Sequence, residues 1–166
     1  MASSLHSTEI YGLPQGGSER LHIGIVVANW NGQVTEALVD GAVSTLRKEG
    51  LPGEHIPIIR VPGAVELTFG ARELARCHLL EAIIVLGCVI QGETPHFDYV
   101  CRSVTQGITA LNLQLAMPVI FGVITAGSLE QALDRAGGSS HKGVEAALTA
   151  LHMAGIDYTS PSYPTK

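Results

Sequence analysis

Four short apolar runs alternate along this chain with segments in which apolar residues recur at helical spacing. The runs at 22–28 (HIGIVVA) and 82–89 (AIIVLGCV) are apolar almost throughout, and two further runs occupy 55–61 and 118–124. Such strands must be covered on both faces, because consecutive side chains point to opposite sides of a sheet. The alternation predicts an α/β protein, a three-layer α/β/α sandwich whose four-stranded parallel sheet has right-handed crossovers.

The first two helices are predicted from apolar spacing and from breaking residues. Val34, Leu38 and Ala42 form one stripe after Asn31, and the Gly-Leu-Pro-Gly sequence at 50–53 stops this helix. The second helix is expected to extend from 62 to about 76. Three of its apolar residues are predicted to face the core: Val65, Phe69 and Leu74.

Capping signals predict the remaining three helices. Thr94 is expected at the N-cap of the third helix, with Pro95 at its first position and its end near Leu115. Ser128 is expected to cap a short fourth helix that ends near Arg135. A closing helix is predicted by residues spaced i, i+3, i+4 and i+7: Val144, Ala147, Leu148 and Leu151.

Length and charge limit the classes of function. The 166 residues have room for one domain, expected at 21–158 between an N-terminal arm (1–20) and a C-terminal tail (159–166). A formal net charge of −5 argues against a non-specific nucleic-acid binder, which needs a basic face. Because only 15% of residues are charged and the mean hydropathy is +0.27, disorder is excluded and partner subunits are expected to cover apolar surface.

The spacing of cysteines and histidines argues against metal binding, and the apolar runs argue against a membrane protein. Cys77, Cys88 and Cys101 match no disulfide framework or zinc-ligand spacing, and they fit a reducing cytosol. The histidines form no HxxxH or HExxH pair, so no metal is expected. No signal-peptide pattern precedes the first apolar run, and no stretch approaches the roughly 20 apolar residues that span a bilayer. A cytoplasmic protein without membrane contact is expected.

Unusual residues follow each predicted strand, where open parallel sheets bind their ligands. Trp30 is either a cap on the sheet edge or a flat platform for a planar heterocycle. Glu66, expected one turn into the second helix, is either a charge favoured by the helix dipole or a site residue. The GETP sequence at 92–95 brings free backbone N–H groups to a helix start, which suits an anion.

Three further side chains also have two interpretations. His96 is either an inert surface histidine or a proton-transfer group beside an anion pocket. Arg135 and Lys142 are either solvated helix-end charges or the cations that an acidic protein needs to bind phosphate. The sequence matches neither GxGxxG nor a Walker loop, which argues against dinucleotides and nucleoside triphosphates.

Taken together, these segments resemble the lumazine synthase family over roughly 20–155. The matching segments occur in family order: ANWN at 28–31, VPGAVE at 61–66, GCVIQGETPHFDYV at 87–100, FGVIT at 121–125, RAG at 135–137 and KG at 142–143. The resemblance implies a flavodoxin-like fold and the penultimate step of riboflavin biosynthesis. In that step 5-amino-6-(D-ribitylamino)uracil condenses with 3,4-dihydroxy-2-butanone 4-phosphate to give 6,7-dimethyl-8-ribityllumazine, phosphate and water, without a metal or organic cofactor.

The resemblance also implies roles for the matched residues. His96 would transfer protons, and Trp30 would stack on the pyrimidine. Further residues would contact the pyrimidine or its ribityl chain: Asn31, Gly63, Ala64, Val65, Glu66, Val89, Ile90, Phe121 and Lys142. The phosphate would be bound by Gly92, Glu93, Thr94 and Arg135. Phe121 and Lys142 would approach from the side of the neighbouring subunit.

Three features depart from the family pattern, and two alternative functions stay open. Val65 replaces a larger aromatic residue, Gln91 stands where many relatives have arginine, and the turn at 138–141 is shorter than the common one. One alternative is an archaeal-type riboflavin synthase, against which the segment around His96 argues. The other is a flavin-binding or cage-forming protein without activity, against which the intact Glu66, His96 and Arg135 argue.

The resemblance finally implies an assembly. Relatives form homopentamers with each active site between adjacent subunits, and those with a short loop between the last two helices tend to pack twelve pentamers into a sixty-subunit shell. The short turn at 138–141 favours the shell. The arm up to Arg20 is expected to lie against a neighbour's sheet edge. A riboflavin synthase is a further candidate partner.

Overall fold

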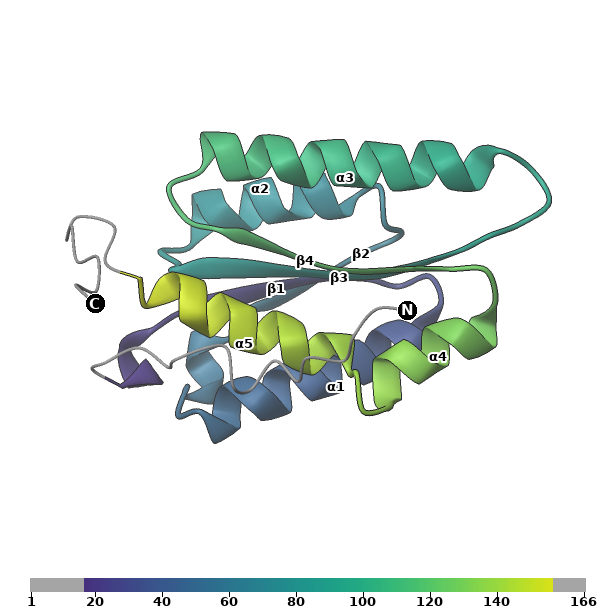
Figure 1. The fold of residues 1–166 in the computed structure, drawn as a ribbon. Helices are drawn as coiled ribbons and strands as arrows, with labels where there is room; N and C mark the ends of the chain where they lie inside the picture. Colours follow the sequence, from purple (N-terminus) through teal and green to yellow (C-terminus); the bar gives the residue numbers. More distant parts are fainter. Residues whose placement is uncertain (1–16, 157–166) are drawn as a thin grey trace, which may run out of the picture.

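The computed structural model describes residues 17–156, whose centre is a parallel sheet of four strands (Figure 1). The strands are β1 (Ile23–Ala28), β2 (Ile58–Val61), β3 (Ala82–Ile90) and β4 (Val119–Ala126), in the order β2-β1-β3-β4. This is the order of flavodoxin-like sheets, which confirms the predicted fold class. The arm and tail expected at the ends of the chain lie outside the described residues, apart from 17–20.

Helices cover both faces of the sheet. On one face lie α2 (Leu67–Cys77) and α3 (His96–Gln114), and on the other α1 (Gly32–Lys48), α4 (Leu129–Gly137) and α5 (Lys142–Ala154) (Figure 1). Two single-turn 3₁₀ helices, η2 (Ser18–Arg20) and η3 (Gly53–His55), precede β1 and β2. None of the helices in 17–156 combines the length and apolar character needed to cross a bilayer.

The alternation of side chains along β1 divides the interior into two cores. Ile23, Ile25 and Val27 pack with α1, α4 and α5, while Val26 and Ala28 pack with α2 and α3. All six residues of β1 are buried, as are the first seven of β3, so the prediction of strands covered on both faces is confirmed. Each fully buried isoleucine or valine side chain contributes roughly 1.5–3 kcal/mol to stability.

The second helix begins later than predicted and turns a different face to the core. α2 starts at Leu67, and Val65 and Phe69, predicted to face inward, are 43% and 61% exposed. The cause is close packing on the sheet, because an added Cβ at Gly70 would lie only 2.8 Å from Val26 Cγ1. Gly70 and Ala71 therefore face the strands between Leu67 and Leu74, and the prediction that Leu74 faces the core is confirmed.

The predicted helix caps have mixed outcomes. Ser128 caps α4, since its hydroxyl accepts the Gln131 N–H at 3.3 Å. The prediction for Thr94 is wrong: α3 begins at His96, and no side chain caps it. The first hydrogen bond of that helix runs from the Asp98 N–H to the Pro95 carbonyl.

Candidate functional site

The carboxyl ends of β1 and β3 form the switch point of the sheet. The chain passes from β1 to β2 on one side and then returns across β1 to β3 on the other. The loops on the two sides diverge here, and open α/β sheets bind ligands in such crevices. The segments 29–31, 62–66 and 91–95 all leave the sheet at this edge, where the sequence predicted the site.

Trp30, Gly63 and Glu66 lie against one another at this edge. The Trp30 N–H donates to the Pro62 carbonyl at 3.1 Å, which ties the loop after β1 to the loop after β2. An added Cβ at Gly63 would lie 3.2 Å from Trp30 Cε3 and 3.1 Å from Glu66 Oε2. A side chain at this position would require the indole or the Glu66 carboxylate to shift by a few tenths of an ångström. The indole remains 69% exposed and is open to a stacking partner.

Glu66 is held by its own loop. It precedes α2 rather than lying one turn inside it, which corrects the prediction. Its Oε2 accepts the Gly63 N–H at 3.0 Å, so the carboxylate closes the 63–66 turn and stays exposed. Ala64 is buried beside it, while Val65 points outward.

Asn31 links β1 to β3. Its side-chain Nδ2 donates to the Cys88 carbonyl at 2.9 Å. With φ 58° and ψ 46°, Asn31 is the one non-glycine residue in 17–156 with a positive φ. Asparagine tolerates this left-handed conformation better than most residues, and such outliers concentrate at functional sites. The link joins residues 57 positions apart, so no local sequence pattern could predict it.

The end of β3 and the start of α3 supply the rest of this edge. Val89 and Ile90 are partly buried, and 91–95 and His96 are exposed. The backbone N–H groups at the start of the 19-residue α3 carry the positive end of its dipole, as an anion site requires. Burial raises the pKa of the Cys88 thiol to about 11, so this cysteine is a neutral packing residue at neutral pH.

Phe121 and Lys142 lie elsewhere on the molecule. Phe121 is opposite Val85 in the β3–β4 register, four positions before the pair Val89–Thr125 near the carboxyl end of these strands. It is 44% exposed and lines, with Lys142, a groove of about 350 Å³ along β4 and α5. The Lys142 ammonium pairs with Glu145 Oε2 at 2.7 Å. We call Phe121 and Lys142, which line this groove, the β4-edge group.

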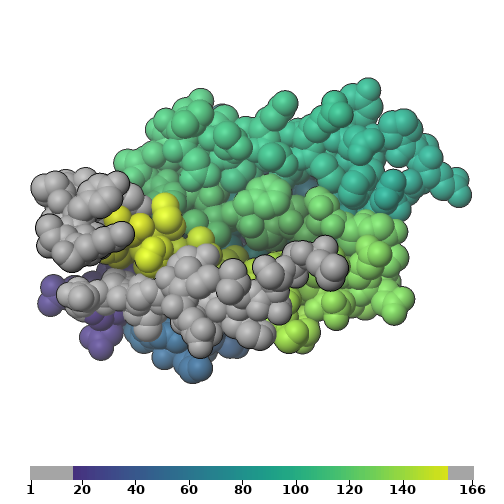
Figure 2. All heavy atoms as spheres, in the orientation of Figure 1, coloured from purple at the N-terminus to yellow at the C-terminus, as the bar shows by residue number. Residues whose placement is uncertain are grey.

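Arg135 lies on α4, on the face of the sheet opposite to α3. It is in the last turn of α4, where its guanidinium donates to the Gln131 carbonyl at 3.0 Å. Figure 2 shows the start of α3, in teal, and α4, in lime green, at the same end of the molecule but on different sides of it. The structure thus links the residues after β1, β2 and β3, while Phe121 and Lys142 line the groove along β4 and α5 and Arg135 lies on α4.

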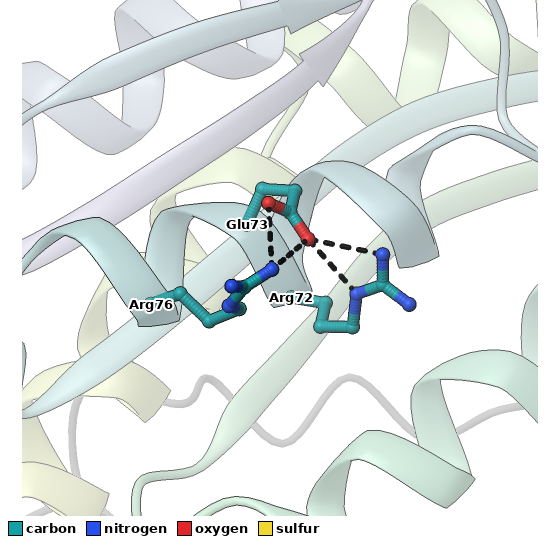
Figure 3. A network of polar contacts seen from close by, with 3 residues as sticks. All are labelled: Arg72, Glu73 and Arg76. Carbon is teal, nitrogen blue, oxygen red and sulfur yellow. Dashed lines mark hydrogen bonds and ion pairs between the residues drawn. The ribbon is translucent and has the colours of Figure 1, made fainter.

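The outer face of α2 carries a side-chain cluster that the sequence analysis missed. The Arg72 guanidinium lies 4.7 Å from the centre of the Phe69 ring. Glu73 accepts hydrogen bonds from Arg72 and Arg76 (Figure 3), and these, led by the bond from Arg72, lower the pKa of its carboxyl. The sequence contains a pattern that could have predicted this cluster. Its residues recur every three or four positions along one face of a helix: Val65, Phe69, Arg72 and Arg76.

No group of three or more His, Cys, Asp or Glu side chains between 17 and 156 is placed to hold a metal ion.

Comparison with known proteins identifies the family. The model of the family described as 6,7-dimethyl-8-ribityllumazine synthase matches residues 20–157. A protein of that name from Parabacteroides distasonis is 56% identical over 137 residues, which cover 82% of this chain and 86% of the relative. The protein of the same name from Porphyromonas gingivalis is 48% identical over 161 residues, which cover 95% of this chain and 99% of the relative. The resemblance drawn from the residues after the strands is confirmed, and the chain belongs to the 6,7-dimethyl-8-ribityllumazine synthase family.

Proposed function

We propose that this chain carries out the reaction of its family at a site that two neighbouring copies complete together. The reaction condenses 5-amino-6-(D-ribitylamino)uracil with 3,4-dihydroxy-2-butanone 4-phosphate and releases phosphate and water. The observation that carries the proposal is the contact of Trp30, Gly63 and Glu66 beside the start of α3, within the part of the chain that matches the family. An aromatic face and an anion-binding helix start suit these two substrates.

The pyrimidine binds over the loops after β1 and β2. The exposed indole of Trp30 stacks on the ring, because a planar heterocycle gains most from a parallel aromatic face. Glu66 accepts hydrogen bonds from the substrate beside it, while its contact with the Gly63 N–H holds it in place. Around these two groups we place the remaining contacts to the pyrimidine or its ribityl chain on this copy: Asn31, Gly63, Ala64, Val65, Val89 and Ile90.

The phosphate binds at the start of α3. The backbone of Gly92, Glu93 and Thr94 surrounds it, and the helix dipole favours its charge. His96 stands in the first turn of the same helix. From there its imidazole gives and takes the protons that move when the amine attacks the ketone, when water leaves and when the phosphate is lost.

The second copy supplies Phe121, Lys142 and Arg135. Two observations support this. Phe121 and Lys142 line a groove along β4 and α5, and Arg135 lies on the face of the sheet opposite to α3. Within residues 17–156, β4 is an edge strand that pairs with β3 alone. The exposed Val65 and Phe69 provide apolar surface for such a contact. Arg135 then brings positive charge to the phosphorylated substrate in an acidic protein, while Phe121 and Lys142 contact the pyrimidine or its ribityl chain.

The assembly is a homopentamer, and the short turn at 138–141 favours a sixty-subunit shell built from twelve pentamers. We place the enzyme in the cytoplasm, where the free thiols of Cys77, Cys88 and Cys101 stay reduced. A riboflavin synthase, which consumes the product, is its proposed partner. The catalytic domain is taken as 21–158, flanked by the arm and the tail.

Turnover with both substrates tests the proposal, with product formation followed by absorbance. Arg135→Ala should raise KM for the butanone phosphate about tenfold or more and leave KM for the pyrimidine nearly unchanged, because it removes a charge-assisted contact to phosphate. Arg47→Ala is the matched control, since Arg47 is likewise in the last turn of a helix, α1. Equal effects on both KM values would show that Arg135 is structural. A wild-type chain that binds riboflavin tightly but forms no product would favour the non-catalytic alternative.

A further inference from the structure

We propose that Asn31 is a positioning residue, whose amide holds the ends of β1 and β3 together so that Trp30 can leave the sheet and face the substrate. The inference rests on the proposed function of this edge and gives Asn31 a second role, in addition to its proposed contact with substrate. Its starting point is the hydrogen bond from Asn31 Nδ2 to the Cys88 carbonyl.

The register of the sheet identifies which backbone group this amide replaces. In these parallel strands the N–H of a paired residue donates to the carbonyl before its partner: Ile25 pairs with Ile58 and donates to Pro57. The β1–β3 pairs run from Ile23–Ala82 to Val27–Leu86. Continuing this register places residue 30 opposite residue 89. The N–H of Trp30 would therefore donate to the Cys88 carbonyl if β1 continued.

Trp30 does not make that bond. Its N–H donates instead to the Pro62 carbonyl, on the side of β2, and its ring lies against Gly63. The Cys88 carbonyl faces the space where β1 has left the sheet, and an unpaired carbonyl there would be costly. The side-chain amide of Asn31 supplies the missing donor.

The backbone of Asn31 secures the same junction. The left-handed conformation of Asn31 turns the chain from β1 into α1, and its carbonyl accepts the N–H groups of Val34 and Thr35 at the start of that helix. One residue therefore connects β1, β3 and α1 directly behind the indole. Movement of this junction would displace Trp30 relative to Val89, and misplacement of this kind is expensive in catalysis.

The experiment compares two substitutions that keep the left-handed backbone accessible. Asn31→Gly removes the amide, and Asn31→Asp replaces the donor with a carboxylate that repels the Cys88 carbonyl. Trp30 is the one tryptophan in the sequence, so its emission and its quenching by acrylamide report on the junction without ligand. Both variants should change these signals in ligand-free protein. Both should also lower kcat about tenfold, with assembly and circular dichroism unchanged.

Asn29→Asp is the matched control, because it makes the same chemical change at an exposed position of the same loop. It should keep kcat within about twofold of wild type and leave the emission unchanged. Unchanged Trp30 quenching in Asn31→Gly, with a rise in KM for the pyrimidine alone, would overturn the positioning role and leave Asn31 only its direct contact with substrate. Altered quenching with wild-type kcat would reduce Asn31 to a structural residue. Failure of the proposed function is distinct, because the wild-type chain itself would then form no product.

Discussion

At the scale of single residues, neighbouring backbone groups determine what each side chain at the sheet edge can do. Trp30 is exposed because its N–H donates to the Pro62 carbonyl in the loop after β2, which takes the residue out of the sheet. Gly63 has no side chain in the space between the indole and Glu66. His96 differs from both, because it stands exposed at the first position of α3. Its removal should therefore change chemistry rather than packing.

His96→Ala tests this difference. We expect kcat to fall by roughly ten- to a thousandfold, the range for a positioned acid–base group, while the melting temperature stays at the wild-type value. His78→Ala is the control, because His78 is an exposed histidine just after α2, at the opposite end of the sheet. Wild-type kcat in His96→Ala across the pH range would contradict the proton-transfer role.

At the scale of secondary-structure elements, the contact between α1 and α5 leaves no spare room. An added Cβ at Gly143 would overlap the carbonyl oxygen of Leu38, a backbone atom that cannot rotate away. Gly143→Ala should therefore force the helices apart and lower the free energy of unfolding by about 1–3 kcal/mol in chemical denaturation. In Gly137→Ala the new methyl group meets nothing within 4 Å, so this control should unfold like wild type. Equal free energies of unfolding for Gly143→Ala and Gly137→Ala would contradict close contact between α1 and α5 at Gly143.

The start of α5 should also be sensitive to pH. His141 caps it by accepting the Gly143 N–H on Nδ1 at 3.2 Å, and burial, the largest effect, lowers the pKa of this imidazole from its ordinary 6.5. Folding therefore favours the neutral ring, and protonation would turn the acceptor into a donor. Stability from this group is fully present above pH 6.5 and falls as the pH drops below that value.

His141→Asn tests the cap, because asparagine offers an oxygen acceptor that does not titrate in this range. Urea unfolding at pH 7.5 and pH 5.5 should show a smaller loss of stability in His141→Asn than in wild type. The comparison between the two proteins removes the contributions of the other histidines. An identical loss in both would show that His141 titrates without affecting the fold.

The elements that could be predicted are those determined by local pattern. β1 and β3 are buried on both faces, and their apolar runs show it directly. The start of α2 could not be predicted, because it depends on the turn that Glu66 closes and on the approach of Gly70 to Val26. The site residues likewise divide into those that a local pattern predicts and those that depend on distant contacts. The loops after the strands were predictable from the topology, whereas the partner of Asn31 lies 57 residues away.

At the scale of the whole molecule, the residues proposed for the site lie in separate places. Trp30 and His96 belong to the loops after β1 and β3, while Phe121 and Lys142 belong to the β4-edge group. When two different surfaces of identical chains meet, the contact is heterologous and closes into a ring if the rotation allows it. The proposed pentamer is such a ring, and its number of subunits is taken from the family resemblance alone. Each contact in the ring would then create one complete site.

Co-refolding of two deficient variants tests the shared site most directly. One variant carries Trp30→Ala and His96→Ala, and the other carries Phe121→Ala and Arg135→Ala. Each is refolded alone and in an equal mixture before product formation is measured by absorbance. If neighbouring copies complete each site, the mixture should recover about a quarter of wild-type activity, since random assembly leaves that share of heterologous contacts with two intact halves. A mixture that assembles fully but shows only the mean activity of the two variants would contradict a site shared between copies.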